Sequence, residues 1–374
     1  MSPSLPRVSA SVAMPKASLQ QVFDNLRAAG YMLVGPTVRD GAIVLEEVDG
    51  LDDLPLGWTD EQRPGHYRLT KTRDNHYFDY GVGPHSWKEF LHPSRLPLFS
   101  VEKNNGNWTI RPAQEPPPRY AFVGVRACDL AAIAIQDRVL IGSEFRYPHY
   151  AARREQVFVL AVNCSQANST CFCASMKTGP KATGGFDLAL TELPDIFLAE
   201  IGSEAGSEAL GDVPWEAATA FDLGRASRVI QRAERQNGRQ MQTDDLPDLL
   251  YENLEHPRWD EVATRCLSCA NCTLVCPTCF CTTVEDVGNL RGTSAERIRI
   301  ADSCFNRDFS HVHGGNIRPS IRSRYRQWLT HKLASWIDQF GTSGCVGCGR
   351  CITWCPVGIE ITEEVNAIRA KAAK

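Results

Sequence analysis

The chain has 374 residues, of which 43% are hydrophobic and 22% charged, and its formal net charge is −4. These proportions indicate an ordinary globular protein with room for two or three domains, and the slight negative charge argues against binding to nucleic acid or an anionic membrane. The start of the chain lacks a charged segment followed by an apolar run, and no apolar run reaches the length of a membrane span. We therefore expect a cytoplasmic protein that does not enter a membrane.

The first part of the chain predicts an α/β domain. After a loose lead-in over residues 1–17, Ser18 is expected to cap a helix over Leu19–Ala29. Two strands follow, joined through the Asp40–Gly41 turn. Residues 50–118 are rich in Pro, Gly, His and aromatic side chains, which predicts short strands and loops.

The next elements suggest a βαβ unit. Tyr120–Val125 and Val157–Val162 are apolar runs of the kind found in buried strands, and Asp129 can cap a helix over Leu130–Leu140 between them. Such a unit gives a partly parallel sheet. Two further strand-like runs complete an α/β domain that we place at residues 18–223.

Residues 224–374 turn helical and carry the most specific motif of the chain. Two cysteine runs each follow the pattern C-x2-C-x2-C-x3-C-P, which is the bacterial spacing for 4Fe–4S clusters. The segment between the runs is long, and Tyr325–Phe340 within it has helical periodicity. We therefore predict an α-helical ferredoxin domain with two 4Fe–4S clusters.

The spacing also assigns the ligands of the two clusters. In each run three thiolates converge on one cluster, and the fourth, just before a proline, ligates the neighbouring cluster. Zinc sites and disulfides are weaker interpretations, because zinc sites use cysteine pairs and nothing marks the chain as secreted. The two ligand sets are Cys266, Cys269, Cys272 and Cys355 for one cluster, and Cys276, Cys345, Cys348 and Cys351 for the other.

Four cysteines in the α/β domain predict a third 4Fe–4S site. Cys128 and Cys164 follow the C-terminal ends of two expected strands, where open α/β sheets place their sites. Cys171 and Cys173 form a doublet beside glycines, and Asp129 is an alternative ligand. The competing interpretation is that Cys128 and Cys164 are small buried side chains.

Three cysteines are left over, namely Cys279, Cys281 and Cys304. They are one short of a metal site made of cysteine alone, so a fourth ligand would come from His311, His313 or Asp302. The other interpretations are a redox-active pair and, in first place, plain core thiols.

Residues 318–332 contain five Arg and Lys side chains and no acid. They form either a solvated helix face or a set of cations that offsets the negative charge of the clusters and raises their potential, with nucleic-acid binding a weaker third choice. The chain has no dinucleotide-binding glycine motif, no Walker A loop and no H-E-x-x-H motif. We therefore expect electrons to pass through the chain without a catalytic residue of its own.

Several motifs together resemble a known family over about residues 18–366. They are Gly124-Val-Arg-Ala-Cys-Asp-Leu130, Cys171-Phe-Cys-Ala-Ser-Met176, Cys276-Pro-Thr-Cys-Phe-Cys281, Arg324-Tyr-Arg-Gln327 with His331-Lys332, and Gly344-Cys-Val-Gly-Cys-Gly-Arg-Cys351. The chain resembles the beta subunit of sulfhydrogenases, which are soluble nickel–iron hydrogenases that use NAD(P), and is similar also to the corresponding iron–sulfur subunit of anaerobic sulfite reductases.

The resemblance implies a non-catalytic electron-relay subunit of an oxidoreductase complex. Its partners would be a flavoprotein subunit with FAD, a 2Fe–2S centre and an NAD(P) site, and the small subunit of a nickel–iron hydrogenase. A sirohaem subunit would replace the hydrogenase if the complex reduces sulfite. A further alternative is a thiol-based sulfur reductase, in which one of the three left-over cysteines attacks sulfur or a disulfide.

Overall fold

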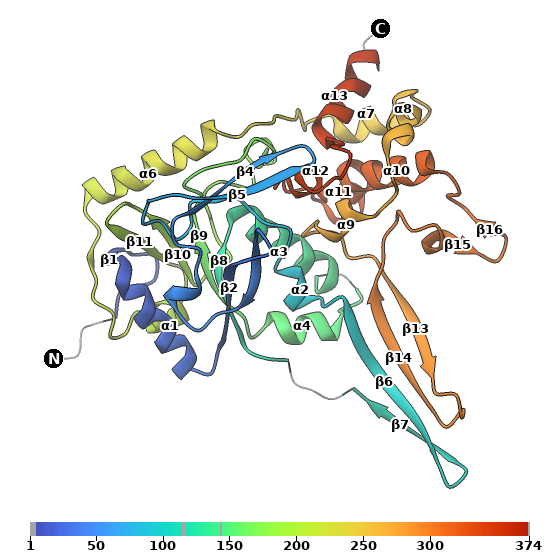
Figure 1. Ribbon diagram of the computed structural model, residues 1–374, viewed down its shortest axis with the longest axis horizontal. Helices are drawn as coiled ribbons and strands as arrows, with labels where there is room; N and C mark the ends of the chain where they lie inside the picture. The colour runs from blue at the N-terminus through green and yellow to red at the C-terminus, as the bar shows by residue number, and fades with distance from the viewer. Residues whose placement is uncertain (1–4, 114–116, 143, 373–374) are drawn as a thin grey trace.

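The computed structural model describes residues 5–113, 117–142 and 144–372. Its largest element is a mixed sheet in the strand order β12-β1-β11-β10-β9-β8-β2-β3 (Figure 1). The strands of this sheet are β1 (Ser11–Pro15), β2 (Met32–Arg39), β3 (Ala42–Glu47), β8 (Tyr120–Val125), β9 (Phe158–Val162), β10 (Leu188–Glu192), β11 (Ile196–Ile201) and β12 (Glu216–Ala217).

The centre of the sheet is parallel, as expected for a βαβ unit. Strands β2, β8, β9 and β10 run parallel to one another, and α3 (Ala127–Leu140) connects β8 to β9. Every residue of β9 is buried, because both faces of the sheet are covered. The N-terminal part of the chain is therefore a mixed-sheet domain.

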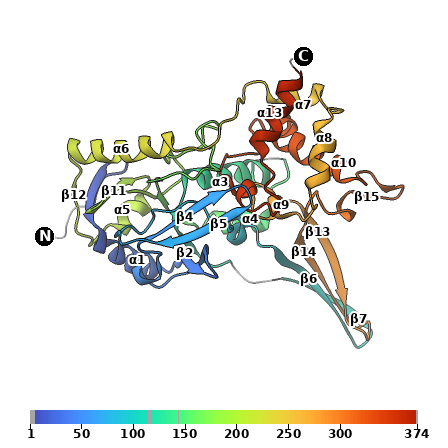
Figure 2. The ribbon, with the colours of Figure 1, turned by 45° about the horizontal axis from the view of Figure 1, so that its top comes forward.

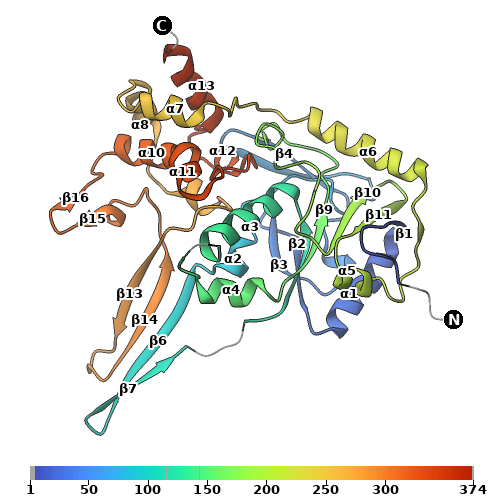
Figure 3. The same ribbon diagram turned by 180° about the vertical axis from the view of Figure 1, so that it is seen from behind.

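Helices cover both faces of this sheet. One core contains the apolar face of α1 (Leu19–Ala28) and the end of α5 (Glu204–Ala209). The opposite core contains side chains of α2 (Lys88–Leu91), α3 and α4 (Pro148–Arg154). Figure 3 shows α3 and α4 lying across the sheet.

Three local predictions were wrong in detail. Ser18 occupies the N-cap position of α1, but its side chain makes no capping hydrogen bond, since a 3₁₀ turn over Lys16–Ser18 leads directly into the helix. Asp129 lies in the first turn of α3 and does not cap it, because the helix already begins at Ala127. The expected lead-in contains β1, which gains ladder hydrogen bonds between β11 and β12; residues 1–4 of it lie outside the described residues.

A second sheet, in the order β13-β14-β6-β7, projects from the body (Figure 2). Its inner strands, from distant parts of the chain, pair with each other, so the prediction from local pattern missed this sheet. Two small hairpins and two short 3₁₀ turns, Leu51–Asp53 and Asp308–Ser310, complete the irregular parts. The remaining strands are β4 (Trp58–Arg63), β5 (His66–Lys71), β6 (Arg95–Asn104), β7 (Asn107–Pro112), β13 (Thr282–Gly288), β14 (Ser294–Ala301), β15 (His311–Val312) and β16 (Gly315–Asn316).

The C-terminal part packs short helices around an apolar core that includes Trp259, Tyr325 and Trp328. A π-helical segment, His331–Ser335, joins two of these helices. None of the helices in the described ranges has both the length and the apolar character needed to cross a bilayer. The helices are α6 (Ala220–Arg235), α7 (Leu246–Glu252), α8 (Arg258–Arg265), α9 (Asn271–Leu274), α10 (Ile321–Thr330), α11 (Trp336–Phe340), α12 (Arg350–Thr353) and α13 (Ile361–Ala372).

Candidate metal centres

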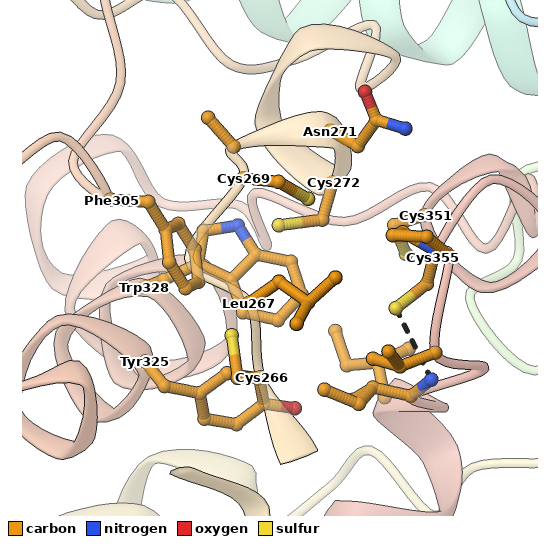
Figure 4. Close-up of a pocket in the computed structure, with 15 residues that line it drawn as sticks. Cys266, Leu267, Cys269, Asn271, Cys272, Phe305, Tyr325, Trp328, Cys351 and Cys355 are labelled. Atoms are coloured by element: carbon orange, nitrogen blue, oxygen red, sulfur yellow. Dashed lines mark hydrogen bonds between the residues drawn. The ribbon is translucent and has the colours of Figure 1, made fainter. Parts of the chain in front are cut away.

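The first predicted cysteine set lines one cavity (Figure 4). Cys266, Cys269 and Cys272 reach it from the end of α8 and from α9, and Cys355 reaches it from the segment after α12. The cavity has an empty volume of about 470 Å³. Apolar side chains that the sequence separates widely form much of its wall, among them Phe305, Tyr325, Trp328, Ile359 and Ile361.

Backbone N–H groups donate to two sulfurs of this set. The N–H of Ser268 donates to Cys266 Sγ at 3.4 Å, and the N–H of Ile359 donates to Cys355 Sγ at 3.3 Å. Ser268 and Ala270 both have positive φ, at 53° and 66°, which turns the loop around the cavity. Hydrogen bonds to ligand sulfurs are one of the features that set the potential of an iron–sulfur cluster, so this loop fits such a group.

The second predicted set adjoins the first. Burial raises the pKa of Cys351 well above its usual value, and the nearby thiols of Cys345, Cys348 and Cys276 add to this shift. The N–H of Gly347 lies 3.5 Å from Cys345 Sγ. Because Cys351 also lines the cavity of the first set, the two sets are neighbours.

A buried lysine contacts the second set. Lys332, 3% exposed, donates from Nζ to Cys276 Sγ at 3.3 Å, to Thr278 Oγ1 at 3.1 Å and to the Gly344 carbonyl at 3.0 Å. Burial opposes its charge, but the thiols of Cys276 and Cys279 hold the pKa of Lys332 well above its usual value. A positive charge therefore lies beside the place where the second set converges.

The four cysteines of the α/β domain also come together. Cys128 lies in the first turn of α3, Cys164 follows β9, and Cys171 and Cys173 lie in the loop beyond it. Burial raises the pKa of each of these thiols. At Cys173 the charges of Cys164 and Cys348 add to burial, and the pKa reaches about 12. This third set therefore lies beside Cys348 of the second set.

A buried arginine with an unused donor faces the third set. Arg126 is 3% exposed, and its Nη2 donates to the carbonyls of Phe78 and Tyr80. Its Nη1 has no hydrogen-bond partner among the described residues. The guanidinium lies close enough to Cys164 to oppose the rise that burial causes in the pKa of that thiol. An unused cationic donor beside buried thiols fits an anionic bound group such as a thiolate-ligated cluster.

A buried ion pair joins the third set to the second cysteine run. Arg350 donates to Asp129 through two hydrogen bonds of 2.8 and 3.1 Å, and the two side chains are 2% and 4% exposed. The sequence offered Asp129 as an alternative cluster ligand, but both its carboxylate oxygens are taken by Arg350. Close by, the N–H of Phe172 donates to the Gly347 carbonyl at 2.9 Å, so the two cysteine loops contact each other directly.

The three left-over cysteines separate into different contacts. Cys279 hydrogen-bonds to Cys276, whereas Cys281 hydrogen-bonds to Cys304. Asp302 also lies near Cys281, while His311 lies in β15 and His313 in the turn after it, and both histidines are exposed. All three thiols line one further cavity of about 390 Å³.

The basic stretch divides between the two roles that the sequence suggested. Arg322 and Arg326 pair with Glu255 at the surface, as a solvated helix face would. Arg324 is buried beside the first set, where it donates to two backbone carbonyls, and Lys332 lies beside the second. Only the two buried cations can therefore influence cluster charge strongly.

Within the described residues, no group of three or more His, Cys, Asp and Glu side chains is spaced to hold a single metal ion. A cubane places its ligand sulfurs on four corners of a cluster, farther apart than ligands of one ion. The cavity of the first set, the N–H groups that donate to its sulfurs and the cations beside the other two sets fit groups of that size and charge.

Comparison with known proteins agrees with this geometry. Residues 265–359 match the family described as a 4Fe–4S dicluster domain, and this range contains both cysteine runs. The C-terminal part is therefore a 4Fe–4S dicluster domain, and the chain is an iron–sulfur protein.

The full chain allows a closer identification. It is 30% identical over 356 residues to Sulfhydrogenase 2 subunit beta of Pyrococcus furiosus, covering 93% of this chain and 95% of that protein. The chain therefore belongs to the family of sulfhydrogenase beta subunits, and it is an iron–sulfur subunit of hydrogenase-related electron transport. No solved structure gave a significant match.

Proposed function

We propose that the chain relays electrons through three neighbouring 4Fe–4S clusters between a flavoprotein and a nickel–iron hydrogenase module. The order of the cysteine sets in space carries this proposal. Cys351 of the second set lines the cavity of the first, and Cys348 of the second set acts on the thiols of the third. The second set thus lies between the other two, which suits transfer in successive steps.

The three ligand sets follow from these positions. Bound clusters would accept and release single electrons, and the protein would hold them, exclude water and set their potentials. Lys332 and Arg126 place positive charge beside the second and third clusters, which favours their reduced, more negative states. The sets are Cys266, Cys269, Cys272 and Cys355; Cys276, Cys345, Cys348 and Cys351; and Cys128, Cys164, Cys171 and Cys173.

The proposal treats residues 18–223 as an α/β domain with the third cluster and residues 224–374 as an α-helical ferredoxin domain. The helices around both cysteine runs support the second assignment. The boundary falls inside α6, and the projecting sheet combines strands of both parts, so the domains are interlocked. All fifteen cysteines are free thiols, which fits a reducing, cytoplasmic setting.

The partners would be a flavoprotein with FAD, a 2Fe–2S centre and an NAD(P) site, and the small subunit of a nickel–iron hydrogenase. The support is the name of the relative, a hydrogenase subunit beta. Mild purification from the native host tests this and should bring both partners with the chain. A sirohaem subunit in place of the hydrogenase would assign the chain to a sulfite reductase, and purification alone with full hydrogen- or sulfite-linked activity would contradict the relay.

The third cluster has its own test. The double substitution Cys171→Ala and Cys173→Ala should lower iron and acid-labile sulfide by about four each per chain, from about twelve to about eight. The matched control is Cys279→Ala, which removes a thiol outside the three sets and should leave both at the wild-type level. Equal iron in the double variant and the wild type, after full reconstitution, would show that the α/β domain holds no cluster.

A further inference from the structure

A cavity of about 390 Å³ lies beside the proposed relay and belongs to none of its three ligand sets. Aromatic side chains form much of its wall, including Phe280, Trp328 and Trp336. The side chains of Arg318 and Lys332 also line it, and none of the lining residues is acidic. The cavity therefore offers an apolar space with a positive side, which suits a small anion better than a cation.

Two thiols in this wall are already paired. Cys281 and Cys304 share a hydrogen bond, and the backbone N–H of Asp302 donates to the Cys281 carbonyl at 2.9 Å, which holds the two segments side by side. The hydrogen bond from Cys304 is the main reason that the pKa of Cys281 falls to about 7 despite burial. Cys281 is thus the more nucleophilic partner, and Cys304 is placed to resolve a bond formed at it.

The pair also lies close to a source of electrons. The charge of Cys272, a ligand of the proposed first cluster, acts on Cys304. Neither Cys281 nor Cys304 belongs to a set that converges on a cluster, and the third thiol of the cavity, Cys279, is hydrogen-bonded to Cys276 instead. The two thiols are therefore free to change their oxidation state while the clusters stay intact.

We infer that Cys281 and Cys304 form a redox-active dithiol that reduces a small anionic compound containing a sulfur–sulfur bond. The thiolate of Cys281 attacks one sulfur of the substrate, the sulfur–sulfur bond breaks, and the leaving sulfur takes up a proton. Cys304 then attacks the mixed disulfide, which releases the second half of the substrate as a thiol and leaves a Cys281–Cys304 disulfide.

Two electrons and two protons restore the dithiol. The electrons arrive one at a time from the proposed clusters, and the protons come from solvent through the cavity. The inference thus rests on the proposed relay for its electron supply, but the first two exchange steps need only the reduced protein. This separation lets an experiment distinguish failure of the dithiol from failure of the relay.

Tetrathionate, an inorganic anion, and cystine, an organic disulfide, are suitable probes for the anaerobically reduced, cluster-loaded protein. With the wild type, mass spectrometry after alkylation should find a Cys281–Cys304 disulfide, and reduced viologen should regenerate the dithiol. Cys304→Ser should trap half of the probe on Cys281, and Cys281→Ser should slow viologen-linked probe reduction at least tenfold. Comparison of the two probes shows whether the cavity takes inorganic or organic sulfur compounds.

Cys279→Ser is the matched control, because it removes the third thiol of the same cavity and should leave the disulfide and the turnover unchanged. Iron per chain is measured in every variant. Unchanged turnover in both Cys281→Ser and Cys304→Ser would overturn the inference, and so would a loss of about four irons in either, since that thiol would then be a cluster ligand. A disulfide that forms but is not regenerated would contradict the relay and leave the thiol exchange established.

Discussion

The charge of Lys332 is held in place by three acceptors, Cys276 Sγ, Thr278 Oγ1 and the Gly344 carbonyl. The sequence placed this lysine in a basic stretch but could not separate it from Arg322 and Arg326, whose partner Glu255 lies on a distant segment. Lys88 was missed altogether, although its Nζ donates to the Cys276 carbonyl at 2.9 Å. Long-range contacts of this kind leave no local pattern in the sequence.

Replacing Lys332 by methionine should lower the midpoint potential of the second cluster. A unit charge a few ångströms away interacts by about 2–4 kcal/mol at an effective dielectric constant of about 20. This is roughly 100 mV for one electron, so we expect a fall on the order of 50–150 mV in an EPR-monitored titration.

Arg322→Met is the control for this substitution, since it removes a surface cation of the same basic stretch and should hardly change the potential. Equal potentials for Lys332→Met and the wild type would show that the lysine has only a structural role.

At the scale of elements, the sequence predicted the βαβ unit well because apolar runs and breakers mark β8, α3 and β9 locally. It also predicted the two cysteine runs, since their spacing is a local property. It did not predict the projecting sheet, in which β6 pairs with β14 across almost two hundred residues. Nor did it predict the contact between the Cys171–Cys173 loop and the loop around Gly347.

That loop contact gives a prediction for Gly347→Ala. Gly347 has φ of +65°, and an added Cβ would lie 2.7 Å from the backbone of Phe172 and Cys173. The two cysteine loops must then move apart, and a strained backbone conformation alone costs about 1–3 kcal/mol. We expect about four fewer irons per chain and a lower unfolding temperature, measured by iron analysis and calorimetry.

Gly184→Ala is the matched control for this change. Gly184 has no neighbouring atom within 4 Å of an added Cβ and no positive φ, so the variant should keep the iron content and the unfolding temperature of the wild type. If Gly347→Ala behaves in the same way, the loop contact does not support the clusters.

Across the whole molecule, the three cysteine sets lie where the mixed-sheet domain meets the C-terminal helices. The Asp129–Arg350 pair and the Phe172–Gly347 hydrogen bond tie the two parts together beside the second and third sets. The sequence located two of the sets by motif and the third by cysteine count alone. Only the structure places the second set between the other two, and this order is the basis of the proposed relay.

An anaerobic redox titration of the intact, cluster-loaded chain, followed by EPR and paired with iron and zinc analysis, tests the central claim most directly. The account predicts reversible one-electron reduction at each cluster, with about three electrons and about twelve irons per chain. A folded chain that holds zinc, or that holds iron without a reversible cluster signal, would contradict it.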